Sequence, residues 1–395
     1  MYFDLSIDFT TTILLSAAAA ALIYITLPYN LFVRRVARRR KVCESMPAVS
    51  DDAPGWPSVS VIVYSQDEAD ALASLLPVIL NQDYPAAFEV IVVNEGDSSD
   101  VRNTVEPMQL AYRNLYLTHT PDGARNLSRK KLAITLGVKA ARYEVVVLTT
   151  VAAIIGSDKW LRAMTSQMVT DPAKHIVLGY AAPVPGDDRA RGHRRRIFNY
   201  AADSVAWLAP AANRHPYRGT ELNLAYRKDL FFKNKGFSRS LNLHYGDDDI
   251  FISEIATPQN CTVELSHDSI VNFSSYDYSK TFRDIAMRHT FTETFIRRRP
   301  RAMMSSGAPA LWILLGTAAA AIVMSPMNIA VISAALIIIA AALTTVILAW
   351  RGAMTALTLT PLRLTIPFFL LMRPFRSVAL IICSRLSHQK KYTWN

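Results

Sequence analysis

Cysteine is scarce in this sequence. The chain of 395 residues holds three cysteines, Cys43, Cys261 and Cys383, and they lie far apart. No two of them have the short spacing of a zinc site, and an odd number of distant cysteines does not form a disulfide framework. These absences exclude a small disulfide-stabilised domain and are typical of a protein that folds in a reducing compartment.

Charge is scarce as well. Only 19% of the residues are charged, 51% are hydrophobic, and the formal net charge is +11. The basic residues gather beside apolar runs and are not spread among aromatic side chains over one folded face, which excludes nucleic acid as a partner. Apolar runs with Lys and Arg at their ends indicate a membrane protein that contacts lipids.

The first of two long uncharged stretches is Phe9–Val33, which is long enough to cross a bilayer. Six Arg and Lys residues follow it within 34–41, whereas no Lys or Arg precedes it. A signal peptide carries its positive charge before the apolar segment, so we expect an uncleaved span. The basic flank predicts that the C-terminal end of this span faces the cytoplasm.

The second uncharged stretch, Ala302–Trp350, is too long for one span and is interrupted at Ser325–Pro326. It predicts a hairpin of two transmembrane helices, over 308–325 and 328–350. Arginines lie in 297–301 and directly after the stretch, so both ends of the hairpin are expected in the cytoplasm.

The C-terminal part of the chain mixes apolar and basic residues. The run Pro361–Leu386 is apolar but carries four arginines. Such spacing suits a helix that lies in the membrane interface, and a further span or a re-entrant segment is the alternative. The expected parts of the chain are a transmembrane segment with its basic flank (1–43), a cytoplasmic domain (44–300), a transmembrane hairpin (301–351) and an interfacial or membrane-associated segment (352–395).

The middle of the chain alternates short apolar runs with segments of helical periodicity. Leu72, Leu75, Leu76 and Ile79 share one face of a helix expected over Asp67–Asn81. This rhythm predicts an α/β fold with a doubly wound, mostly parallel sheet, whose ligands bind past the carboxyl ends of its strands. The expected strands are Val59–Tyr64, Val90–Val93, Leu115–Leu117 and Val145–Leu148, and a second helix is expected over Ser128–Ala140.

The stretch His244–Ser253 reads HYGDDDIFIS and places three carboxylates directly before an apolar run. A general base requires such a carboxylate at the mouth of a cleft, with a packed helix behind it. The alternative is an acidic turn that caps a helix, because Asp is favoured at helix starts.

Five stretches together resemble the family 2 glycosyltransferases, which have a GT-A fold and bind nucleotide-sugars. SVSVIVYSQDEADALASLLPVILNQDYP resembles the first strand, loop and helix of the family, and FEVIVVNEGDSSD resembles its second strand and acidic loop. SRKKLAITLGVKAARYEVVVLTT is similar to the helix and strand before the metal site, and RGTELNLAYRKDLFFKNKGF is similar to the acceptor-side segment. GDDDIF resembles the motif that carries the catalytic base.

The resemblance assigns roles to six residues of this chain. Asp248 occupies the position of the catalytic base, with Asp247 beside it. Glu95 takes the place of an Asp that contacts the nucleoside, and Lys130 takes the place of a cation near the diphosphate. The nucleotide-sugar site implied by the family also includes Asp67, in the loop after the first strand, and Arg288, on the Arg of the QxxRW motif.

The sequence also departs from the family pattern. The family's DxD motif, which holds a divalent metal, should fall at 150–152, where Thr150 and Ala152 replace both carboxylates. The resemblance implies Mg²⁺ or Mn²⁺ as cofactor, but the usual ligands of either ion are missing. The Gln and Trp of QxxRW are absent too, and Glu221 with Leu222 stands where close relatives have Gly and Arg.

The resemblance implies a membrane-bound, inverting glycosyltransferase of envelope glycan synthesis. Its partners would be a nucleotide-sugar donor and a lipid-linked or polysaccharide acceptor. We expect a bacterial, multi-pass protein of the inner (cytoplasmic) membrane, with the catalytic domain facing the cytoplasm. The degenerate DxD motif supports an alternative, in which the chain is a catalytically inactive scaffold for a partner subunit.

Overall fold

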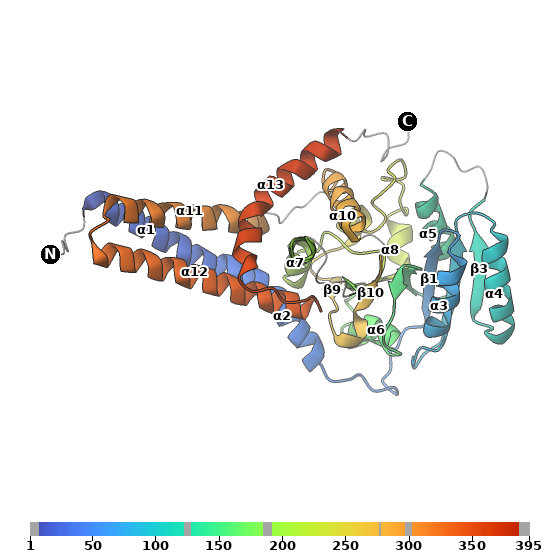
Figure 1. Ribbon diagram of the computed structural model, residues 1–395. Coiled ribbons are helices and arrows are strands. Elements are labelled where there is room, and N and C mark those ends of the chain that lie inside the picture. Colours follow the sequence, from blue (N-terminus) through green and yellow to red (C-terminus); the bar gives the residue numbers. More distant parts are fainter. Residues whose placement is uncertain (1–7, 122–127, 185–191, 276–277, 297–301, 387–395) are drawn as a thin grey trace. The chain divides into compact units, whose positions relative to one another are not determined.

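The structure is a computed structural model that describes residues 8–121, 128–184, 192–275, 278–296 and 302–386 (Figure 1). The basic run at 297–301, on which the expected orientation of the hairpin partly rests, lies outside the described residues. The chain divides into two compact units. The first comprises Met1–Arg38, Asp187–Ala209 and Arg299–Ile381, and the second comprises Arg39–Gly186, Pro210–Arg298 and Ile382–Asn395.

A sheet of seven strands forms the core of the second unit. The strands are β1 (Val59–Ser65), β2 (Phe88–Asn94), β3 (Leu115–His119), β4 (Val145–Thr150), β6 (Ile176–Leu178), β8 (Leu224–Arg227) and β9 (Cys261–Val263). Their order is β3-β2-β1-β4-β8-β6-β9, and β8 runs antiparallel to both of its neighbours. The predicted mostly parallel sheet is therefore confirmed, and each of the four expected strands is present with slightly longer bounds.

The register of the central strands brings their carboxyl ends to one edge. Ser65 pairs with Asn94 across β1 and β2, and Tyr64 pairs with Thr150 across β1 and β4. Almost all residues of β1 and β4 are buried, as expected for apolar, β-branched strands covered on both faces.

Three helices cross over between the first four strands: α3 (Ala69–Leu80), α4 (Ser99–Ala111) and α5 (Arg129–Ala140). The strand order and right-handed crossovers place α3 and α4 on one face and α5 on the other (Figure 1). Gly137 lets α5 approach the sheet closely, since a Cβ there would lie 2.7 Å from Ile62 and 3.0 Å from Val93.

A second, three-stranded sheet is formed by β5 (Ala153–Ile154), β10 (Val271–Phe273) and β7 (Ala181–Pro183). The remaining helices of this unit are α6 (Trp160–Thr170), α8 (Lys228–Lys233), α9 (Asp249–Ile255), the 3₁₀ turn η2 (His267–Ser269) and α10 (Tyr278–Thr292).

The first unit is helical. A continuous helical segment runs through α1 (Phe9–Tyr24), a π-helical turn η1 (Ile25–Tyr29) that contains Pro28, and α2 (Asn30–Ser45). A proline removes one hydrogen bond of the helix, which accounts for the irregular turn at this point. The other helices are α7 (His193–Ala212), α11 (Ala302–Met324), α12 (Ile329–Ala356) and α13 (Thr365–Leu386).

Four helical segments of the described chain are long and apolar enough to cross a membrane: Phe9–Ser45, α11, α12 and α13. The first three lie side by side, and Ala18, Ala318 and Ala335 pack at their contact (Figure 1). Small residues allow close packing of helices where no water is present to drive association. Helices are present over both stretches predicted for the hairpin: α11 begins before 308 and ends at Met324, and α12 begins at Ile329 and ends beyond 350. Their place in a membrane stays a prediction.

Asn223 joins the two sheets of the second unit and provides a test of the fold. Its buried amide donates to the carbonyls of Tyr180 (3.1 Å) and Ser269 (2.7 Å) and accepts from the indole of Trp160 (3.1 Å). Asn223→Ala leaves all three groups unpaired, so we expect unfolding to become easier by about 2–5 kcal/mol. Denaturant unfolding of the purified protein measures this. The exposed Asn103→Ala is the control, and an equal effect of both changes would contradict the assignment.

Candidate active site

The candidate site lies at the carboxyl edge of the main sheet. Tyr64, on β1, donates its hydroxyl to the carboxylate of Glu95, in the loop after β2. The ammonium of Lys130, on the first turn of α5, lies 5.3 Å from the centre of the Tyr64 ring. Residues from β1, from the loop after β2 and from α5 therefore meet at one place.

The acidic stretch 247–249 forms the start of α9. Gly246 precedes it with φ = 108°, a conformation that L side chains rarely adopt, and a Cβ there would lie 2.5 Å from Ile250. Asp248 is the N-cap residue of α9, but its side chain makes no capping hydrogen bond. The helix-cap alternative therefore does not account for the carboxylate of Asp248.

Asp249 differs from its two neighbours. Its carboxylate accepts hydrogen bonds from the backbone N–H of Ile250 (2.8 Å) and from the hydroxyl of Thr292, at the end of α10. The guanidinium of Arg218 lies 3.7 Å away. These contacts make Asp249 a structural residue that fixes α9 against α10.

Arg288, on α10, holds three carboxylates at once. Its guanidinium bonds both oxygens of Glu221 (2.9 and 3.2 Å), one oxygen of Asp248 (2.8 Å) and, at 3.4 Å, one oxygen of Asp247. Lys130 completes the group: its ammonium lies 3.2 Å from Asp247 and also pairs with Glu221. We call these five residues the charge cluster; their side chains are between 1% and 19% exposed.

The pKa values of the two aspartates of the charge cluster are shifted in opposite directions. Burial, with a smaller contribution from ionised Asp247, raises the pKa of Asp248 to about 6, although Arg288 opposes both effects. Burial also acts to raise the pKa of Asp247, but Lys130 and Arg288 outweigh it and hold that pKa below its usual value. Two carboxylates whose environments separate their pKa values are typical of acid–base sites.

The cations of the charge cluster respond to the same surroundings. Burial lowers the pKa of the Lys130 ammonium, and the carboxylate of Asp247 partly restores it. Burial also disfavours the charged form of Arg288, yet the surrounding aspartates raise its pKa above the usual value. Arg288 therefore supplies a permanent positive charge beside Asp248.

Lys131 holds the loop that precedes the acidic stretch. It is fully buried, and its ammonium donates to the carbonyls of Ser240, Leu243 (2.9 Å) and Tyr245 (2.8 Å). Burial lowers the pKa of Lys131 to about 8. These contacts make Lys131 a residue that fixes the loop leading to Gly246.

Two hydrogen bonds connect the charge cluster to the end of β4. The hydroxyl of Thr149 donates to the carbonyl of Leu222 (3.0 Å), and the neighbouring N–H of Glu221 donates to the carboxylate of Asp248 (3.3 Å). The acidic stretch therefore lies next to the strand end at which the family's metal motif was expected.

The residues at 150–152 do not fit a divalent metal. The hydroxyl of Thr150 accepts a hydrogen bond from the N–H of Ala152 (3.3 Å), and Ala152 has no oxygen in its side chain. The nearby acids Glu95 and Glu221 are already engaged by Tyr64 and by Lys130 and Arg288. Within the described residues, no group of three or more His, Cys, Asp or Glu side chains could hold a metal ion.

The structure brings four of the six predicted site residues together: Asp247, Asp248, Lys130 and Arg288. Glu95 is adjacent to them through Tyr64. Asp67 lies in an exposed loop, where it exchanges hydrogen bonds with Asn94 (2.7 and 3.0 Å), the residue before Glu95, and has φ = 60°. Their roles in binding and catalysis stay predictions. Sequence reasoning gave no role to Glu221, although its departure from the family's Gly was a signal.

Comparison with solved structures gives the fold a parallel. The mannosyltransferase PcManGT from Pyrobaculum calidifontis, in complex with GDP-Man and Mn²⁺, matches 92% of this chain and 99% of its own, with a TM-score of 0.52 and 20% identity. Glucosyl-3-phosphoglycerate synthase from Mycobacterium tuberculosis, in complex with Mn²⁺, UDP and glucosyl-3-phosphoglycerate, matches 64% of this chain and 85% of its own (TM-score 0.43, 14% identity). No family model and no curated protein sequence matches the chain.

The first of these likenesses covers nearly the whole chain and shows the fold. The second unit has the fold of the GT-A glycosyltransferases, and apolar helices lie near both ends of the chain. The predicted fold class is thereby confirmed.

Proposed function

We propose that this protein is a membrane-bound, inverting glycosyltransferase of family 2 type. It transfers a sugar from a nucleotide-sugar to a hydroxyl of a lipid-linked or polysaccharide acceptor. The observation that carries the proposal is the carboxylate of Asp248, which is buried, raised in pKa to about 6 and held by Arg288 at the carboxyl edge of a GT-A sheet.

In the proposed reaction Asp248 acts as the general base. It takes the proton of the acceptor hydroxyl as that oxygen attacks the anomeric carbon, and the bond from this carbon to the diphosphate oxygen breaks. A single displacement requires one base and inverts the configuration, so no covalent intermediate on the enzyme is needed. A pKa near 6 leaves Asp248 mostly ionised at neutral pH and still basic enough to accept a proton.

The leaving nucleoside diphosphate gains negative charge, which a cation must stabilise. In this chain the available cations are Lys130 and Arg288, because residues 150–152 do not fit a metal. Both cations are paired with Glu221 in the described structure. On this proposal Glu221 is an internal anion, and a bound diphosphate takes over part of its contacts.

The membrane setting is part of the proposal. The four apolar helical segments support a multi-pass protein, with residues 44–300 as the catalytic domain and 301–351 as a transmembrane hairpin. The positive charge of 34–41 supports a cytoplasmic position for the catalytic domain, as in a bacterial inner membrane. An acceptor held in the membrane, such as a lipid-linked envelope glycan, fits this arrangement.

The alternative is an inactive scaffold for a partner subunit, which the degenerate metal motif supports. Burial of an ionisable carboxylate costs stability. Groups with a raised pKa are typical of functional sites, and an inactive scaffold has no need of one. Asp248 therefore favours catalysis over scaffolding.

Asp248→Asn removes the base and keeps the size of the side chain. We expect kcat for sugar transfer by the purified full-length protein to fall about 10²–10⁴-fold. Thermal unfolding should be unchanged or shifted to higher temperature, because the buried carboxylate is costly to ionise. The exposed Asp100→Asn serves as the control. Equal, measurable transfer by the Asp248 variant and the wild type would exclude Asp248 as the base, and no transfer by either protein would leave only the scaffold hypothesis.

The pH dependence follows from the same group. The base works only when ionised, so kcat/KM should fall about tenfold per pH unit below pH about 6 and level off above it. Asp247→Asn should move this inflection to lower pH, because ionised Asp247 raises the pKa of Asp248. Arg288→Gln should move it to higher pH, since Arg288 lowers that pKa. Rate profiles from pH 4.5 to 9 measure both shifts, and shifts of the same sign would contradict the assignment.

Glu221→Gln tests the internal anion. Without this carboxylate, Lys130 and Arg288 have one competitor fewer, so UDP or GDP should bind about tenfold more tightly, a gain of roughly 1.4 kcal/mol. Isothermal titration with and without Mn²⁺ measures the change, and the metal should leave the affinity unaltered. Glu106→Gln, an exposed change of equal charge, is the control. Weaker binding by the variant, or wild-type binding only with Mn²⁺, would make Glu221 part of a metal or donor site instead.

A further inference from the structure

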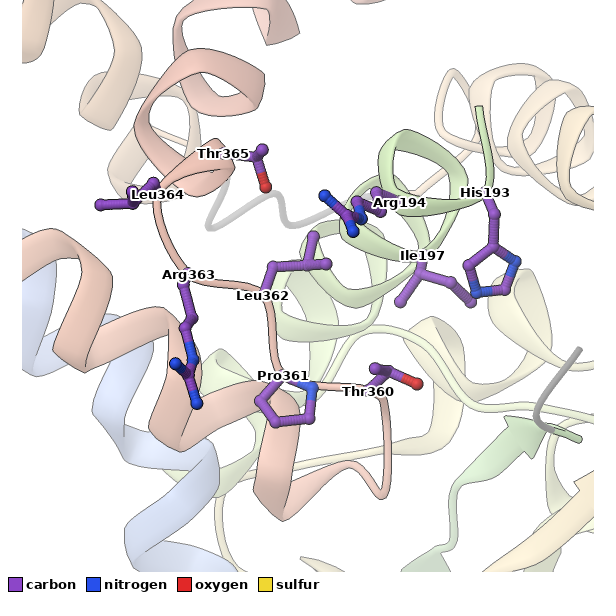
Figure 2. A pocket seen from close by; sticks show the side chains of 9 residues that line it. All are labelled: His193, Arg194, Ile197, Thr360, Pro361, Leu362, Arg363, Leu364 and Thr365. Carbon is purple, nitrogen blue, oxygen red and sulfur yellow. The ribbon is translucent and has the colours of Figure 1, made fainter. Parts of the chain in front are cut away.

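The first unit contains a cavity of about 370 Å³, apart from the charge cluster. Figure 2 shows its lining side chains, which come from the first turns of α7 and from the segment 360–365 between α12 and α13. A volume of this size is in the range of small-ligand sites and is larger than a single ion requires.

The polar part of the lining is basic. His193 and Arg194 come from α7, and Arg363 comes from the connecting segment, together with the hydroxyls of Thr360 and Thr365. Among the described residues, none of those that line the cavity is an acid. Guanidinium and hydroxyl groups are the usual donors to phosphate oxygens, whereas a cationic ligand would find no partner here.

The two arginines of the lining differ from the arginines of α13 in their ion pairs. The guanidinium groups of Arg373 and Arg376 both bond Asp203 of α7, at 2.9–3.2 Å. Among the described residues, Arg194 and Arg363 have no carboxylate partner, and both are exposed. Their charge is therefore available to a ligand.

The cavity is framed by packed elements. Phe198, on α7, contacts Trp350 of α12 and Phe369 of α13, with ring centres 5.0 and 5.8 Å apart. Thr358, just after α12, has φ = 55°, which is unfavourable for a β-branched residue and occurs where the surrounding structure imposes it. The backbone conformation at the end of α12 thus fixes where the segment that carries Arg363 begins.

The apolar part of the lining continues along α13. Ile197 and Leu362 are buried in the wall of the cavity, and Leu364 is 85% exposed at its rim. Phe368 and Phe375, on α13, are exposed too. A basic cavity with an exposed leucine at its rim thus precedes a helix that carries exposed aromatic side chains.

We propose that this cavity binds the phosphate group of a membrane lipid, with the lipid chain along Leu364, Phe368 and Phe375. Arg194 donates hydrogen bonds to the phosphate, and Arg363, which points away from Arg194 in Figure 2, adds positive charge to the site. The position along the membrane normal agrees: the uncharged part of α12 ends at Trp350, and six more helical residues add about 9 Å, which reaches the headgroup layer.

The inference rests on the membrane setting of the proposed function, but lipid binding does not require sugar transfer, so the two can fail separately. The test uses full-length protein in a nonionic detergent. Its probes are dioctanoyl phosphatidic acid, dioctanoyl phosphatidylcholine and inorganic phosphate, each titrated and followed by calorimetry. We expect phosphatidic acid to bind more than tenfold more tightly than either of the other two probes, because only it offers both an accessible phosphate charge and a chain.

The variant Arg194→Gln/Arg363→Gln should weaken the binding of phosphatidic acid at least tenfold. Arg195→Gln/Arg351→Gln removes the same charge from residues that do not line the cavity, and it should bind as the wild type does. If the first double variant is not folded, by circular dichroism, each single change is compared with Arg195→Gln alone. Equal loss in both double variants would show a nonspecific charge effect and overturn the site. Equal affinity for inorganic phosphate would assign a free anion, and equal affinity for phosphatidylcholine would remove the role of the phosphate; either result overturns the proposal.

Discussion

The contact between Arg288 and its three carboxylates is the interaction on which the second unit depends. It joins α10 to the start of α9 and to the segment before β8, and Lys130 adds α5 to the same cluster. Charges this well buried are costly unless they have partners, so removal of either cation would leave the carboxylates uncompensated. Burial raises the pKa of Asp248 and the pairing with Arg288 lowers it, so the contact that holds these elements together also tunes the proposed base.

Most of the sheet could be predicted from the sequence because its signal is local. Runs such as Val59–Tyr64 and Val145–Leu148 are apolar and β-branched at strand length, and they are strands in the structure. The acidic stretch could be located from the sequence, but the separate roles of its three aspartates could not be distinguished. Asp247, Asp248 and Asp249 are identical in composition and adjacent, and only tertiary partners distinguish them: Lys130 for the first, Arg288 for the second and Thr292 for the third.

The remaining features depend on partners that are distant in sequence. Glu221 and Arg288 are 67 positions apart, and no periodicity relates them. The arginines of Pro361–Leu386 were interpreted together as interfacial anchors, whereas Arg373 and Arg376 pair with Asp203 of α7, which sequence reasoning had not considered. Pattern alone gives the type of such residues, and the fold decides which charge is used internally and which stays available.

A built-in cation has a consequence that a bound metal does not have. A metal site consists of carboxylates that are unpaired until the cation binds, and it gains positive charge only when the ion binds with the donor. Lys130 and Arg288 are present at all times, so the buried site must supply anions to balance them, and Asp247, Asp248 and Glu221 do so. With Asp248 ionised, two positive charges face three negative ones, and an arriving diphosphate must compete with a carboxylate. Protonation of Asp248 by the acceptor removes one of those negative charges as the diphosphate leaves, so on the proposed function the base and the cations act on the same charge balance.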